Sequence, residues 1–165
     1  MSLTLEILRE IKFFQAFSDP ELTHIMQSGQ VVKHEAYANI VIEGEMSYGF
    51  YIVLHGMLGV YKTDKASGNS YDVAHLRENN FFGEMSLFDE GPRAATVRAL
   101  TQCELLFVPK DGFTQFVNAS VERRIRFYES CIKALVDRLR ELDDSYVMSQ
   151  YQLWQTALKH KDEVA

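Results

Sequence analysis

The sequence predicts a mainly β fold, a small antiparallel barrel or sandwich, with helices at both ends. Across residues 31–110, short apolar stretches recur at fairly regular intervals between glycines and polar turns, as in small all-β domains. Helical spacing of apolar residues precedes this region, and neither proline nor glycine occurs after Gly112. With 165 residues, of which 47% are hydrophobic, the chain can bury one core without disulfides. We expect three parts: an N-terminal helical segment at 1–30, a β-barrel at 31–110 and C-terminal helices at 111–165.

Two short helices are expected before the strands. Leu5, Leu8 and Ile11 recur at helical spacing. Ser18 then offers an N-cap for a second helix, and Glu21 is the acid three residues later that completes a capping box. The expected strands that follow contain VVKH, NIVIEG, FYIVLHG, LGVYK, YDVAHL, ATVRAL and CELLFV.

The charge balance and the cysteines argue against several classes of function. The 17 Lys and Arg residues are outnumbered by 23 Asp and Glu residues, which argues against a basic surface for direct DNA binding. The residues after Tyr146 are also too few for a helix-turn-helix domain. Cys103 and Cys131 have no CxxC spacing, so neither a metal site nor a disulfide is expected. Without a signal peptide or a membrane-length apolar run, the chain is expected to be cytoplasmic and to have no membrane contact.

One segment inside the β region does not fit a strand. GEMSLF, from Gly83 to Phe88, is poor in β-branched residues and lies between turn signals, which predicts a single helical turn. The start of such a turn presents backbone N–H groups to an anion, and Gly83 lets a ligand approach that backbone. Glu84 accepts hydrogen bonds, which suits the hydroxyl groups of a ribose.

A second polar group follows in PRAAT, at residues 92–96. Arg93 supplies a planar guanidinium suited to a phosphate, and Ala94 and Ala95 are too small to block their own amides. The alternative is a ligand-free surface ion pair between Glu84 and Arg93, worth at most about 1 kcal/mol. Spacing alone does not decide between the two interpretations.

FGEMSL and PRAATV together resemble the phosphate-binding cassette of the cyclic-nucleotide-binding family, which includes regulatory subunits of cyclic-AMP-dependent kinase and catabolite activator proteins. The cassette would span residues 81–99. Residues 42–45 (IEGE) and 50–56 (FYIVLHG) are similar to that family's "EGD" and "YxxxxG" strand signatures, and the resemblance covers roughly residues 11–142. The chain departs from the family where glycine often stands at Tyr37 or Ala38, and where an acidic residue is common near Tyr48.

The resemblance implies an eight-stranded jelly-roll β-barrel with N-terminal helices and a long C-terminal helix. Glu84 would bond the ribose 2′-hydroxyl and Arg93 the exocyclic phosphate oxygens. The remaining ligand-binding residues would contribute mainly backbone: Gly83, Met85, Ser86, Ala94 and Ala95. In relatives that prefer cyclic GMP, the residue after the cassette arginine is often Thr or Ser. Ala94 therefore favours cyclic AMP, and cyclic GMP stays an alternative ligand.

The C-terminal region carries a heptad pattern. Apolar or aromatic residues alternate steps of three and four at Ile125, Tyr128, Ile132, Leu135, Leu139, Leu142 and Tyr146. We expect a parallel homodimer through Ile125, Ile132, Leu135, Leu139 and Leu142. Alternatively this stripe packs on its own barrel, as family members do when the helix covers the base of the ligand as a lid. Arg124, Tyr128 and Cys131 would then contact the base, with Tyr128 stacking on adenine.

A binding role is favoured over catalysis, and no catalytic residue or cofactor is expected. A cupin-like enzyme would need converging histidines, yet the histidines here are scattered without an HxH or HExxH motif: His24, His34, His55, His75 and His160. The expected function is a cyclic-nucleotide sensor that relays ligand occupancy through its C-terminal helix to an unknown effector protein or domain. The other alternative is a barrel that has lost its ligand and serves only for dimerisation or protein docking.

Overall fold

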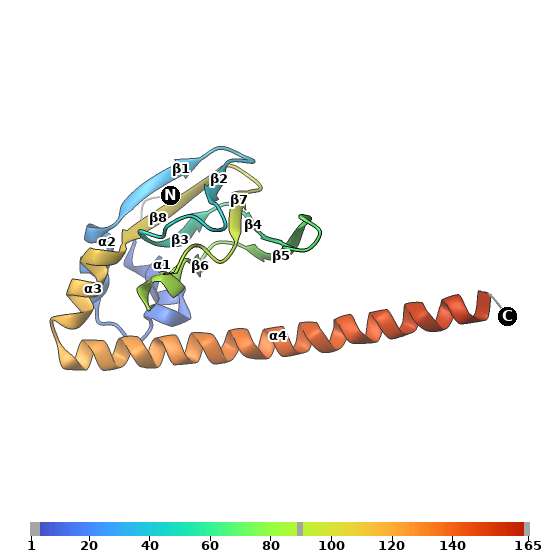
Figure 1. Cartoon of the computed structure of the whole chain (residues 1–165). Helices are drawn as coiled ribbons and strands as arrows, with labels where there is room; N and C mark the ends of the chain where they lie inside the picture. The colour runs from blue at the N-terminus through green and yellow to red at the C-terminus, as the bar shows by residue number, and fades with distance from the viewer. Residues whose placement is uncertain (1–3, 89–90, 164–165) are drawn as a thin grey trace.

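The computed structural model describes residues 4–88 and 91–163 (Figure 1). Positions 89–90 of the expected cassette and the ends at 1–3 and 164–165 lie outside the described residues. The helices are α1 (Leu5–Glu10), the 3-10 turn η1 (Lys12–Phe14), α2 (Asp19–Ser28), the 3-10 turn η2 (Glu84–Leu87), α3 (Lys110–Asn118) and α4 (Val121–Glu163). The strands are β1 (Gln30–His34), β2 (Asn39–Val41), β3 (Gly49–His55), β4 (Leu58–Thr63), β5 (Ser70–Leu76), β6 (Phe81–Phe82), β7 (Thr96–Ala99) and β8 (Cys103–Pro109).

The strands form two four-stranded antiparallel sheets, ordered β1-β8-β3-β6 and β2-β7-β4-β5. Apart from β4 and β5, which are neighbours in one sheet, successive strands alternate between the two sheets, so the predicted jelly-roll fold with flanking helices is confirmed. The expected barrel is not closed by hydrogen bonds, because the described strands pair within two separate sheets and form no continuous ring. The seven apolar stretches all contain strands, and β6 is an eighth that the pattern did not separate from the cassette.

Two apolar cores lie on opposite faces of the first sheet. Phe50 and Ile52 of β3 face the helices, whereas Val53 on the alternate face packs with Leu58 and Val97 of the second sheet. Both faces of β3 are therefore covered, which explains its almost continuous run of apolar residues. The helical layer and the second sheet fix β3 from both sides, and β6 pairs with β3.

The N-terminal helices begin as the sequence predicts. Ser18 lies at the N-cap of α2, and its backbone N–H donates to Glu21 Oε2 at 2.9 Å. Glu21 is buried and also accepts hydrogen bonds from Arg123 Nε at 3.1 Å and Arg126 Nη2 at 2.5 Å. The same carboxylate thus caps α2 and holds the first turns of α4.

The C-terminal region is not one continuous helix, although neither proline nor glycine occurs after Gly112. The chain breaks between α3 and α4, where Ser120 begins a new helix without any proline or glycine. The Ser120 hydroxyl accepts the N–H of Arg123 at 3.3 Å, and its carbonyl accepts that of Arg124 at 3.1 Å. Beyond this break α4 runs beneath the sheets and then extends far past them (Figure 1).

Candidate functional site

The predicted helical turn follows β6 directly. Gly83 has φ of 84°, in the left-handed region that favours glycine, and η2 begins at the next residue. Ser86 is buried and donates its hydroxyl to the Gly83 carbonyl at 2.7 Å, which closes the turn on itself. Met85 is exposed on the outside of the turn. The Ser86 hydroxyl is therefore engaged within the turn, and the turn faces a ligand with its backbone, as the resemblance implies.

Arg93 lies inside the molecule, next to this turn. Its residue is 9% exposed, and its guanidinium carbon is 5.7 Å from the centre of the Tyr51 ring. Among the described residues, Arg93 Nη1 has no hydrogen-bond partner. An unpaired buried N–H of a cation is costly, since burial lowers the pKa of this guanidinium while Tyr51 and Glu84 partly offset the effect. Arg93 is thus not the exposed member of the surface ion pair that the alternative interpretation requires.

Gly83 makes room for this guanidinium. A Cβ atom at Gly83 would lie 2.3 Å from Arg93 Nη1 and 3.3 Å from the carbonyl oxygen of Gly49. The glycine therefore serves two purposes, because it adopts a positive φ and it lets the arginine pack against the cassette backbone. The packing of Arg93 against Gly83 was not predicted from the sequence.

The IEGE segment holds the backbone of Arg93 in place. The Arg93 N–H donates to the Glu45 carbonyl at 2.8 Å, and the Gly44 N–H donates to the Arg93 carbonyl at 2.9 Å. The two signatures that the sequence analysis recognised separately are therefore one unit in space. Together with Gly83, they aim a buried cation at the start of η2.

Comparison with known proteins decides the family. The sequence profile of the cyclic nucleotide-binding domain matches residues 31–120. The chain belongs to the cyclic nucleotide-binding domain family. The matched region of this domain contains all eight strands, except the first residue of β1, and the whole cassette.

Its relatives are regulatory proteins. The cAMP-dependent protein kinase regulatory subunit of Neurospora crassa is 26% identical over 74% of this chain and 31% of the relative. The cAMP-activated global transcriptional regulator CRP of Salmonella typhimurium is 26% identical over 72% of this chain and 56% of the relative. The co-crystal structure of the regulatory domain of Toxoplasma gondii PKA with cAMP matches with a TM-score of 0.66 and 29% identity, over 78% of this chain and 49% of that one. The chain thus matches about a third to about half of the length of each of these relatives.

Helix α4 passes directly beside the cassette of this domain. The ring of Phe88, which follows η2, stacks on Phe127 at 5.3 Å and lies 6.4 Å from Tyr128. Cys131 is buried, and burial, followed by the charge of Glu84, raises the pKa of its thiol to about 12. Two of the predicted base contacts, Tyr128 and Cys131, therefore lie near the cassette.

The third predicted base contact, Arg124, is half-buried in the first turn of α4, where its N–H donates to the Ser120 carbonyl at 3.1 Å. Phe88 and Phe127, by contrast, were not predicted as part of the site. The sequence held a clue to Phe127, because this residue lies two positions after Ile125 and therefore on a different face of the helix from the heptad stripe.

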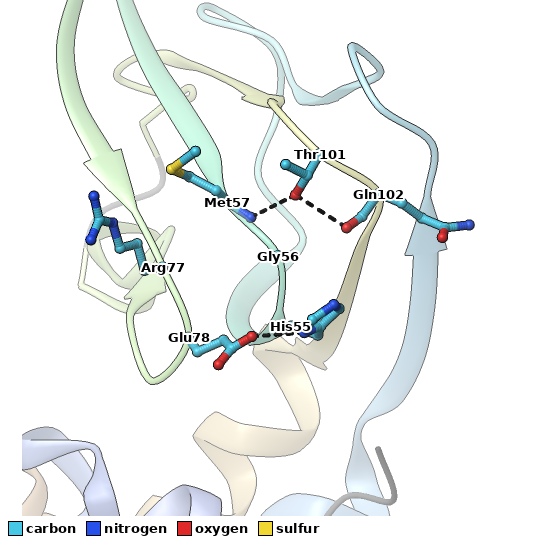
Figure 2. A pocket seen from close by; sticks show the side chains of 7 residues that line it. All are labelled: His55, Gly56, Met57, Arg77, Glu78, Thr101 and Gln102. Atoms are coloured by element: carbon cyan, nitrogen blue, oxygen red, sulfur yellow. Dashed lines mark hydrogen bonds and ion pairs between the residues drawn. The ribbon is translucent and has the colours of Figure 1, made fainter.

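The structure also has a hollow away from the cassette (Figure 2). It lies among the connections at one end of the sheets, where His55 Nδ1 is 2.7 Å from Glu78 Oε1. The Met57 N–H donates to Thr101 Oγ1 at 3.0 Å in the same place. These bonds tie neighbouring connections together, and none of the lining residues belongs to the cassette or to α4.

Within residues 4–88 and 91–163, no three His, Cys, Asp or Glu side chains are grouped as a metal site would require. Among those same residues, no helix combines the length and apolar character needed to cross a lipid bilayer.

Proposed function

We propose that this domain binds a cyclic nucleotide and acts as a sensor, with Arg93 holding the phosphate and Glu84 the ribose. The observation that carries the proposal is the buried Arg93 Nη1 without a partner beside Gly83, because a phosphate oxygen would satisfy it. The backbone at Met85, Ser86, Ala94 and Ala95 completes the lining. The role is binding, and we propose no catalytic residue.

Cyclic AMP is the proposed ligand, ahead of cyclic GMP. The residue after Arg93 is Ala94, which is exposed beside the cassette and has no hydroxyl for the amino group of guanine. The names of the kinase and transcription relatives include cAMP, which supports the same choice.

The proposal is tested by calorimetric titration with cyclic AMP, cyclic GMP and 5′-AMP. Arg93→Ala should weaken cyclic AMP binding by about 2 kcal/mol or more, about thirtyfold, because a charge-assisted bond to phosphate is lost. Arg98→Ala is the matched control, since Arg98 also lies over a tyrosine ring, at 5.5 Å from Tyr61, but is exposed on β7. A wild-type protein that binds neither cyclic nucleotide, with both variants folded, would refute the proposal and favour a docking module without a ligand.

We also propose that ligand occupancy is relayed to α4 through the Phe88–Phe127 contact. Phe88 closes the ligand-facing turn, and its ring lies at an angle of 11° to that of Phe127. A ligand that moves η2 would therefore also move the Phe88–Phe127 contact. The equilibrium between two positions of α4 would shift only by the difference in the ligand's affinity for the protein in those two positions. The downstream recipient would be an effector protein or domain.

The same helix supports the proposed homodimer. Phe127, Ser130 and Cys131 form its buried face, whereas the heptad stripe is exposed, with Leu135 at 57% and Leu139 at 58%. Ile125, Ile132 and Leu142 are exposed as well, so these five residues do not pack on the barrel of their own chain. A second copy of the helix would cover it in parallel register.

Sedimentation equilibrium tests the dimer. The double variant Leu135→Asp with Leu139→Asp should be monomeric, because two buried carboxylates without partners are costly. Lys133→Asp is the control, since Lys133 is exposed outside the stripe. A wild-type protein that is monomeric at high concentration would exclude the homodimer.

A further inference from the structure

Lys62 of β4 lies against the second half of the cassette. Strands β4 and β7 are neighbours, with Tyr61 opposite Thr96. This register brings the Lys62 ammonium to the Ala94 carbonyl oxygen, to which it donates a hydrogen bond. The side chain of Lys62 is 50% exposed, so that its position depends on the groups that hold it.

Glu43 supplies that hold. Its Oε1 atom lies 2.6 Å from Lys62 Nζ, and its Oε2 atom accepts the N–H of Thr63 at 2.9 Å. The Glu43 N–H in turn donates to Thr96 Oγ1 at 3.0 Å, which links the backbone of Glu43 to β7. The hydrogen bond from Lys62, followed by that from Thr63, lowers the pKa of Glu43. Glu43 is therefore an ionised partner with a fixed position, and it connects Lys62 to the cassette.

These bonds set the direction of two peptide groups. In a trans peptide, the carbonyl oxygen and the following N–H point to opposite sides. The Arg93 carbonyl accepts the Gly44 N–H at 2.9 Å, so the N–H of Ala94 points the other way. The Ala94 carbonyl accepts a hydrogen bond from Lys62, so the N–H of Ala95 points away from Lys62.

The two amides are available to a ligand. Among the described residues, neither the Ala94 nor the Ala95 N–H donates to a protein acceptor. Ala94 is exposed and Ala95 half-buried, and the two residues directly follow Arg93 in the chain. An anion at Arg93 would meet N–H dipoles whose direction is already fixed, and fixed dipoles need no reorganisation on binding.

We propose that Lys62, held by Glu43, is a positioning residue that orients the Ala95 amide toward the ligand's phosphate. The proposal rests on the proposed function, because the phosphate is that of the bound cyclic nucleotide. Lys62 itself makes no contact with the ligand. It acts through the peptide between Ala94 and Ala95.

Lys62→Met keeps an unbranched side chain, one atom shorter, and removes its donor. Cyclic AMP should bind about fivefold to tenfold more weakly, the size expected for one misaligned hydrogen bond. Lys33→Met is the matched control, because Lys33 also pairs with a glutamate, Glu104, at 2.6 Å between neighbouring strands, far from the cassette. Its affinity should equal that of the wild type.

Salt separates orientation from simple attraction between the ammonium and the phosphate. The loss in Lys62→Met should be equal at about 0.05 M and about 0.5 M salt, whereas a long-range attraction would be screened. A loss that disappears at high salt, or an affinity equal to that of the wild type, would overturn the proposal.

A second measurement needs no ligand. In the free protein, the amide NMR signal of Ala95 should shift in Lys62→Met and stay in place in Lys33→Met. If this signal does not move, Lys62 does not orient the peptide, whatever the affinities are. If the signal moves but the wild type binds no cyclic nucleotide, the proposed function fails and the assignment of a phosphate to this amide fails with it.

Discussion

Replacing Gly83 by alanine separates the stability of the cassette from its capacity to bind. Gly83 and Gly68 both have positive φ, 84° and 72°, so alanine at either position should cost about 1 kcal/mol of unfolding free energy. Only Gly83 has a close neighbour, because its new Cβ would lie 2.3 Å from Arg93 Nη1, whereas Gly68 has no atom within 4 Å. The guanidinium is the end of a flexible side chain and can yield.

The two variants should therefore agree in stability and differ in affinity. Gly83→Ala would displace Arg93 from its place over Tyr51, and the lost bond to phosphate should weaken cyclic AMP binding at least about tenfold. Gly68→Ala should bind as the wild type does. Urea denaturation measures the first quantity and calorimetry the second. Equal affinities in the two variants would show that the position of this guanidinium does not matter to the ligand.

Three other predictions concern stability and reactivity. Desolvation would raise the pKa of Glu21, yet bonds from Ser18, Arg123 and Arg126 hold it at about 2 against an ordinary 4.5. About 3 kcal/mol of stability should thus be present above pH 4.5 and be lost as the pH falls toward 2, and acid unfolding of Glu21→Gln should lack this component. Tyr37 has φ of 69° and an exposed side chain, so Tyr37→Gly should raise the unfolding free energy by about 0.5–1 kcal/mol in urea denaturation; a loss of stability would contradict this. Cys103 and Cys131 are both buried and burial raises the pKa of each thiol, so a disulfide reagent should modify them only at the rate of unfolding, and rapid native modification would be the contrary result.

The sheets were predictable because each long strand carries its own apolar stretch. Strand β6 was not, since Phe81 and Phe82 have no alternation to recognise and pair only with β3. The break before α4 was hidden for a related reason. Ser120 is an ordinary N-cap residue, and only the packing of α3 and α4 determines that the chain turns there.

The cassette was identified from residues that act locally, whereas its energetics depend on distant ones. Glu84, Arg93 and the helical turn follow from the sequence and the family resemblance. The burial of Arg93 does not, because it requires Tyr51 on another strand and the space left by Gly83. In α4, periodicity gave the stripe but not its surroundings, since a heptad pattern is the same whether a barrel or a second helix covers it.

The clamp of Arg123 and Arg126 on Glu21 has a mechanical consequence for α4. It fixes one end of the helix to α2, and further along the helix Asp137 forms an ion pair with Lys12 of the N-terminal segment at 3.0 Å. At about 1.5 Å per residue, the helix from Arg126 to Trp154 is about 42 Å long. A tilt of about 10° at the clamped end would then displace the far end by about 7 Å, which is more than the pitch of one helical turn, about 5.4 Å. An adjustment of the size of a single side chain at the cassette would be magnified into a movement large enough to change which surfaces meet.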